Sequence, residues 1–212
     1  MSSTLTWGKR MAATAVAALA LAAVPGTGVA ATAAAEHSIP FTCKTRLSGE
    51  WLDVTDYARG VDVTAPASAA PGSTFDVVID PKPIYPVPDF NKELREVHWS
   101  YSLPANAELV KHSLSGGAGL NGSKVTTSVQ GSKLTIDVSG PLPGGAEFDV
   151  PTLTLTFTAP ESGAVEVKPG GSSYDDLGFG WERLHPTTNE WDPFLCYPDQ
   201  AEPVVLSSTS VA

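Results

Sequence analysis

The feature that most constrains the fold is a strict alternation of apolar and polar residues over Thr152–Thr158. Leu153, Leu155 and Phe157 fall on one side of an extended chain, and four threonines fall on the other. Successive side chains of a β-strand point to opposite faces, so this period of two predicts a strand with one buried face. The β-branched threonines suit the wetter face.

The same alternation recurs along the chain, with glycine- and proline-rich turns such as Pro143–Gly145 between its repeats. Only Asp89–Glu96 reads as briefly helical, and it is too short for a stable helix. Many short strands predict an all-β domain, an antiparallel Ig-like β-sandwich of about 8–10 strands, with a closed barrel as the alternative. The expected strands are Thr74–Asp80, Val97–Tyr101, Lys133–Ser139 and Thr152–Thr158, with weaker ones at Phe41–Arg46, Gly60–Thr64, Glu108–Ser113, Lys124–Val129, Ala164–Lys168 and Pro203–Ser207.

The N-terminus has the three parts of an export signal. Lys9 and Arg10 precede an apolar run, and small residues then frame two candidate cleavage sites, after Ala30 and after Ala35. The run is shorter than the ~20 apolar residues of a membrane helix. We therefore expect residues 1–35 to be a signal-peptide helix and residues 36–212 to be a single secreted domain, with no membrane span after cleavage. An uncleaved N-terminal anchor is the alternative.

Export changes how the charges and cysteines are interpreted. Removing the signal leaves 11 basic and 23 acidic residues, a net charge of −12, which disfavours nucleic acid and anionic lipid surfaces as partners. Cys43 and Cys196 are the two cysteines, and neither lies in a zinc-binding spacing. In an oxidising compartment we expect them to form a disulfide. The bridge would close a loop of about 150 residues, worth ~5 kcal/mol of stability.

The most unusual segment is Ser172–Asp199, where aromatic and acidic residues interleave without a sustained strand period, so we expect a long loop. Exposed rings stack on the C–H faces of sugars, and carboxylates accept hydrogen bonds from sugar hydroxyls. The segment therefore predicts a ligand-binding site for a cell-surface glycan. Its candidate residues are Tyr174, Asp175, Asp176, Trp181, Glu182, His185 and Trp191. The alternative is that the large aromatics pack this loop onto the sandwich.

No motif in the sequence predicts catalysis, a metal or a cofactor. A glycosidase needs two carboxylates about 5–10 Å apart, and the adjacent Asp175 and Asp176 would point apart on an extended chain. A Gly-x-Ser-x-Gly elbow is absent. Asp53, Asp56 and Asp62, or Asp175 and Asp176, could hold calcium, but aspartates in turns usually cap the backbone. We expect a non-catalytic protein, with a secreted hydrolase of glycans or esters as the alternative.

A second local feature is the proline-rich segment Asp80–Pro88, which has four prolines. Prolines at this density predict an extended connection that follows a strand and protects a sheet edge. This segment, or the glycine-rich segment Ser115–Gly122, could instead contact a secreted enzyme as part of an inhibitor or accessory protein.

Several short patterns together resemble the secreted Ig-like β-sandwich proteins of actinobacteria. They are Ile39–Cys43 after an Ala-rich signal, Leu142–Gly145, Pro151–Leu153 and the late Cys196. The resemblance implies an exported location, a sandwich fold and a disulfide between the two ends of the domain. It implies no catalytic residue. The sequence therefore predicts a secreted binding or surface-associated module whose partner is a glycan or a secreted protein.

Overall fold

The computed structural model describes residues 32–212, and within them the chain forms strands and no helix. The expected signal helix and the cleavage site after Ala30 lie outside the described residues. No helix in the described part is long and apolar enough to span a membrane. The strands are β1 (Thr32–Leu47), β2 (Glu50–Pro66), β3 (Ser68–Ala69), β4 (Thr74–Pro81), β5 (Glu93–Ser102), β6 (Glu108–Ser115), β7 (Val125–Gln130), β8 (Lys133–Val138), β9 (Leu142–Pro143), β10 (Thr152–Thr158), β11 (Gly163–Pro169), β12 (Phe179–Leu184), β13 (Trp191–Pro198) and β14 (Ser207–Val211).

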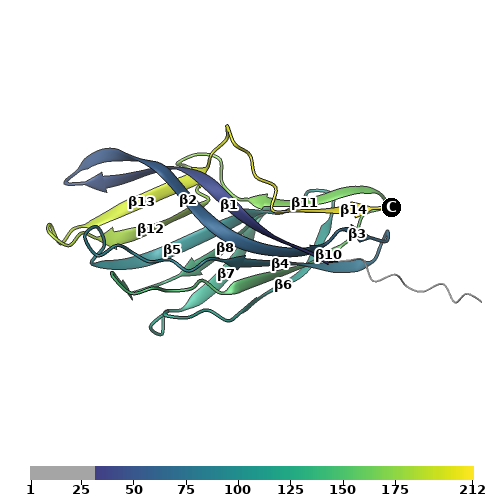
Figure 1. Cartoon of the computed structure of the whole chain (residues 1–212), viewed down its shortest axis with the longest axis horizontal. Coiled ribbons are helices and arrows are strands. Elements are labelled where there is room, and N and C mark those ends of the chain that lie inside the picture. The colour runs from purple at the N-terminus through teal and green to yellow at the C-terminus, as the bar shows by residue number, and fades with distance from the viewer. Residues whose placement is uncertain (1–31) are drawn as a thin grey trace, which may run out of the picture.

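The predicted all-β sandwich is confirmed (Figure 1). Hydrogen-bonded strands follow the order β7-β8-β5-β12-β13-β1-β2-β4-β10-β6, and this path folds over at the long β1–β2 hairpin. The two ends of the path meet through side chains, where His112 Nε2 lies 2.9 Å from Thr127 Oγ1. Within residues 32–212 no ladder joins β6 to β7, so the molecule is a sandwich rather than a closed barrel.

Alternation along β10 builds the centre of the core, as the sequence predicts. Leu153, Leu155 and Phe157 are fully buried and pair across the ladder with apolar residues of β4. From the other layer, the ring of Trp99 meets the edge of Phe179 with their centroids 5.0 Å apart. Each side chain of this size contributes roughly 1.5–3 kcal/mol when buried. Burial of two inner faces therefore stabilises the sandwich.

The predicted disulfide between Cys43 and Cys196 is confirmed. The two cysteines lie directly opposite each other in the β1–β13 ladder, with Cα atoms 4.2 Å apart. Both are buried in the core. The bridge spans 153 positions and joins the first strand of the domain to its penultimate one.

The expectation of a long loop over Ser172–Asp199 is wrong, because residues 179–198 form the β12–β13 hairpin. The alternation was hidden by two charged residues that face inward, Arg183 and Asp192, which are direct cross-strand partners. It was also hidden by Trp191, which faces outward. Inward charges opposite one another can interact, so the strand tolerates a pattern that hydrophobicity alone does not recognise.

Three smaller expectations also change. Asp89–Glu96 starts in a single turn, where the amides of Phe90 and Asn91 both donate to the Val87 carbonyl, and it enters β5 at Glu93. The last strand begins at Ser207, where Pro203–Ser207 was expected. The described residues form fourteen strands where 8–10 were expected, since β3 and β9 have two residues each and β12 and β13 arise in the supposed loop.

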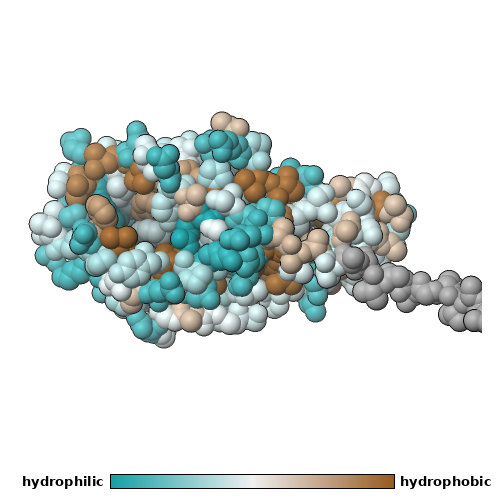
Figure 2. All heavy atoms as spheres, viewed as in Figure 1, coloured by the Kyte–Doolittle hydropathy of each residue, from teal (hydrophilic) through white to brown (hydrophobic). Residues whose placement is uncertain are grey.

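Large apolar side chains are exposed mainly at one end of the sandwich. Among residues 32–212, five of the eight belong to the β1–β2 hairpin tip, the proline-rich segment and the turn that follows it. They are Trp51, Leu52, Tyr85, Val87 and Phe90. Figure 2 shows brown residues around a hollow at this end, on the left in the view. An apolar group of this kind marks a candidate interaction site.

Candidate binding pocket

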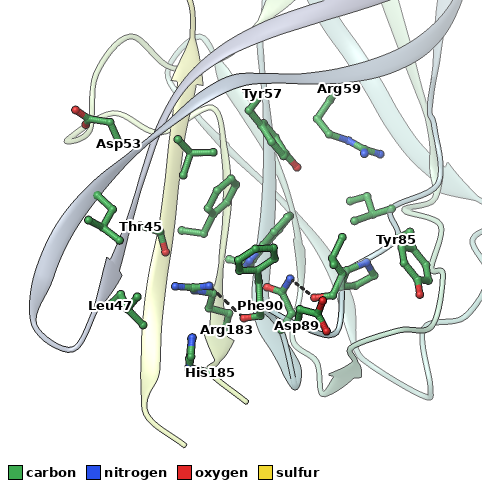
Figure 3. A pocket seen from close by; sticks show the side chains of 18 residues that line it. Thr45, Leu47, Asp53, Tyr57, Arg59, Tyr85, Asp89, Phe90, Arg183 and His185 are labelled. Atoms are coloured by element: carbon green, nitrogen blue, oxygen red, sulfur yellow. Dashed lines mark hydrogen bonds between the residues drawn. The ribbon is translucent and has the colours of Figure 1, made fainter. Parts of the chain in front are cut away.

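A pocket of about 500 Å³ opens at this end of the molecule (Figure 3). Three segments build its walls: the tip of the β1–β2 hairpin, the proline-rich segment and the β12–β13 hairpin. The fold thus brings together both segments that the sequence singled out. The lining residues are Thr45, Leu47, Leu52, Asp53, Val54, Tyr57, Arg59, Ile84, Tyr85, Pro86, Val87, Asp89, Phe90, Asn91, Trp181, Arg183, His185 and Phe194.

Aromatic rings form the floor of the pocket. The ring of Trp181 stacks on Phe194, with centroids 4.6 Å apart and an angle of 18° between the planes. Tyr57 meets the same phenylalanine edge-on at 5.1 Å. These three side chains come from three different strands, so the packing of the sandwich holds them in place. A floor of this kind binds the apolar part of a ligand.

Hydrogen bonds to its backbone hold the proline-rich segment in place as one wall of the pocket. Ile84 exchanges two backbone hydrogen bonds with Phe148, at 2.8 and 3.0 Å. Arg59 Nη2 donates to the carbonyl oxygens of Lys82 and Pro83, at 2.6 and 2.8 Å. A proline-rich strand cannot continue a ladder because prolines lack an N–H group. Its carbonyls therefore remain available for the Arg59 guanidinium.

Tyr57 and Arg59 share one face of β2 and form one end of the pocket. Burial raises the pKa of Tyr57 to about 12, and the nearby Arg59 charge partly opposes this rise. The phenol is therefore neutral at physiological pH. Arg59 Nε is buried without an acceptor, and no described residue forms a salt bridge with this guanidinium.

Arg183 lies toward the other side of the pocket and ties its walls together. Only 6% of the residue is exposed. Its Nη1 donates to the Phe90 carbonyl at 3.1 Å, and its Nη2 donates to the Arg46 carbonyl at 3.2 Å. Burial lowers the pKa of Arg183, and the negative charge of Asp192 opposes that shift. Arg183 thus joins the turn after the proline-rich segment to β1 and has a carboxylate neighbour.

The structure places two of the predicted site residues in this pocket, Trp181 and His185. Trp181 is 7% exposed, and its buried Nε1 has no hydrogen-bond partner. His185 Nδ1 accepts hydrogen bonds from the amides of Thr187 and Thr188, at 3.2 and 3.4 Å. In neutral His185 the proton is therefore on Nε2, which remains free to donate.

Two other predicted residues lie on the outside of the sheet. Glu182 follows Trp181 in β12 and points the opposite way, as alternation requires. Its Oε2 accepts from Arg95 Nη2 at 2.6 Å, and the same guanidinium lies 4.0 Å from the centre of the Trp191 ring. Arg95 therefore contacts both Glu182 and Trp191 on the outer face. The sheet separates these two residues from the pocket.

The remaining predicted residues, Tyr174, Asp175 and Asp176, precede β12. The Tyr174 ring lies under Lys44 Nζ at 4.0 Å. Asp176 pairs with Lys133 Nζ at 2.5 Å, which lowers the pKa of the carboxyl. Asp175 lines a separate polar groove over β5, β7 and β8. Within residues 32–212 no group of three or more His, Cys, Asp or Glu side chains is placed to hold a metal ion.

Sequence reasoning missed Tyr57, Arg59 and Arg183 as pocket residues. Tyr57 and Arg59 lie two positions apart in an extended segment, so a longer prediction for β2 would have placed them on one face. Arg183 was not recognised because its strand was interpreted as a loop.

Comparison with known proteins finds similar folds among solved structures but no similar family or curated sequence. No family model matches the chain, and no curated protein matches it. Among solved structures, it is similar to a "Putative membrane anchored protein from Corynebacterium diphtheriae", with a TM-score of 0.56 and 14% identity over 84% of this chain. The match covers 38% of that protein's chain. At this identity the likeness shows a shared fold, here with a protein of an actinobacterium.

Two cohesin modules are also similar, at lower scores. A cohesin module from a Clostridium perfringens family 33 glycoside hydrolase has a TM-score of 0.40 and 13% identity, covering 71% of this chain and 94% of its own. The cohesin of a Clostridium thermocellum type I cohesin–dockerin complex has a TM-score of 0.40 and 9% identity, covering 72% and 99%.

Proposed function

We propose that this chain is a secreted, non-catalytic binding module that holds a small amphiphilic molecule in the pocket. The observation that carries the proposal is the pocket itself, with an aromatic floor and polar groups at its ends. Its volume of about 500 Å³ falls within the roughly 300–1,000 Å³ of small-molecule sites. The exposed apolar residues at its mouth would lose contact with water when a ligand binds.

The proposal of secretion has two supports. The N-terminal segment has the composition of an export signal. The buried Cys43–Cys196 disulfide is typical of proteins that fold in an oxidising compartment. A binding site exposed at one end of an exported sandwich can capture a ligand outside the cytoplasm.

The proposal of binding without catalysis rests on how the polar groups of the pocket are used. Arg183 holds two backbone carbonyls, and Arg59 holds two more. His185 uses Nδ1 to order its own turn. A general base needs a free acceptor within reach of the proton it removes. The two arginines are occupied in positioning the walls, and His185 is left with a donor rather than a free acceptor, which suits recognition better than proton abstraction.

A glycan is the ligand that the sequence predicted. Of the predicted site residues, Trp191 on the outer face of the sheet is the aromatic one at which a sugar could still bind. One side of that ring is covered by Arg95, and the Trp181 ring is stacked on Phe194. Sugars stack on free ring faces, so we place the primary ligand in the pocket. A glycan array with a Trp191→Ala control would test the outer face, and binding that Trp191→Ala abolishes would support a sugar there.

The pocket is tested with nile red, a neutral apolar dye whose fluorescence rises away from water. We expect saturable binding of one dye per chain. Val87→Trp should weaken it at least tenfold, because Val87 lines the mouth and an indole would fill the opening. Val129→Trp on β7 is the matched control, since both valines are 43% exposed and Val129 lies outside the pocket lining.

Two results would contradict this proposal. One is the absence of saturable dye binding by the wild-type chain. The other is equal weakening by Val87→Trp and Val129→Trp while both variants keep the melting temperature of the wild type.

A further inference from the structure

We propose that the natural ligand of this pocket is a monocarboxylate with a linear alkyl chain, whose carboxylate pairs with Arg59. The inference rests on the proposed function, because it names the ligand class of the same pocket. Its basis is a guanidinium at one end of an apolar cavity that has no charged partner of its own.

The first step concerns the charge of Arg59. Its recorded hydrogen-bond acceptors are the neutral carbonyls of Lys82 and Pro83, and its Nε is buried without an acceptor. Within residues 32–212 no carboxylate lies within salt-bridge distance of it. Charges removed from water are normally paired. The structure therefore contains a cation whose natural complement is an anion from outside the chain.

The second step concerns how many negative charges the ligand carries. The other cation of the pocket, Arg183, has Asp192 as its direct cross-strand partner. Asp192 acts electrostatically on Arg183 and also pairs with Arg46 Nε at 3.6 Å, whereas no carboxylate among the described residues acts on Arg59 in this way. Asp53 and Asp89 also line the pocket, but both are exposed to water, which screens their repulsion. One uncompensated charge matches a carboxylate better than a doubly charged phosphate.

The third step concerns the apolar body of the ligand. In Figure 3, Arg59 and Tyr57 lie at one side of the pocket, and Leu47 and His185 lie at the opposite side. Trp181 and Phe194, which stack on each other, also line the pocket. A molecule with its head at Arg59 would therefore lay its body along aromatic and aliphatic side chains. A flexible alkyl chain fits this shape and buries methylene groups along its length.

The test compares two ligands that differ only in the head group, decanoate and decan-1-ol, by isothermal titration calorimetry on the full exported chain. A charged hydrogen-bonded pair contributes about ten- to a hundredfold in affinity. We expect decanoate to bind at least tenfold more tightly than decanol. Arg59→Gln should remove this difference by weakening decanoate alone, and Arg59→Lys should restore part of it.

The controls separate the role of charge from that of folding. Arg95→Gln, which removes a guanidinium from the outer face, should leave both affinities unchanged. Decanol binding by Arg59→Gln reports that the pocket is intact, because Arg59 also anchors the proline-rich segment. Equal affinity of the wild type for decanoate and decanol would overturn this inference and leave the proposed function standing. If neither ligand binds and nile red also fails, the proposed function falls with it.

Discussion

Removal of the Cys43–Cys196 bridge is the perturbation whose magnitude follows most directly from the structure. The cross-link spans 153 positions. Loop-closure entropy for a loop of this length gives a loss of about 5 kcal/mol in the free energy of unfolding. A domain of this kind has a total stability of about 5–15 kcal/mol. The Cys43→Ala, Cys196→Ala double variant should therefore be marginally stable.

The assay is urea denaturation followed by tryptophan fluorescence, with the oxidised wild type as the reference. The expected loss corresponds to a decrease in melting temperature of about 10–20 °C for a domain of this size. Far-UV circular dichroism of the double variant in buffer shows whether the sandwich is retained. A loss below about 2 kcal/mol would refute the reasoning, because it would mean that the unfolded chain gains little freedom when the bridge is removed.

Three further predictions concern the N-terminus, Arg183 and Tyr57. Mass spectrometry of the exported protein should find cleavage after Ala30 rather than Ala35. Cleavage after Ala35 would remove Thr32–Ala35, which pairs with β2 in the structure, so a mature chain that starts at Glu36 would contradict this prediction. Arg183→Gln should lower the free energy of unfolding by about 2–3 kcal/mol, since two carbonyls lose a charged donor. Glu182→Gln on the exposed face should change it by less than about 1 kcal/mol, and similar losses from both would show that Arg183 has no special role. The pKa of Tyr57, raised by burial to about 12, favours the neutral phenol in the folded state, so its contribution to stability is complete below pH 10 and is lost as the pH rises toward 12. Tyr57→Phe should flatten that part of the stability profile in denaturation experiments across this pH range.

Much of the fold could be predicted because the information is local. Alternation over Thr152–Thr158 and Lys133–Ser139 identifies strands whose inner residues are buried in the structure. The pairing of Cys43 with Cys196 follows from their number and the expected compartment. The β12–β13 hairpin escaped prediction because Arg183 and Asp192 face inward, and their compatibility depends on being opposite each other across a ladder.

The candidate site shows the limit of local information more clearly. Trp181 and Glu182 fall on opposite faces of the sheet once their segment is known to be a strand, but hydrophobicity along the sequence did not identify that strand. The proline-rich segment and the aromatic segment lie about a hundred positions apart in sequence. The fold places both as walls of one pocket, together with the tip of the β1–β2 hairpin. No periodicity encodes such a contact, since it arises from the path of the whole chain.

By itself, the sequence of this protein determined that the chain is built of strands, that its two cysteines pair and that its N-terminus resembles an export signal. These properties depend on residue type, spacing and a two-residue period, which are readable along one dimension. Tertiary structure alone decided which side chains share a cavity and which charge lacks a partner. Arg59 becomes conspicuous only when every neighbouring element is in place, because the absence of a counter-ion is a property of the folded surroundings.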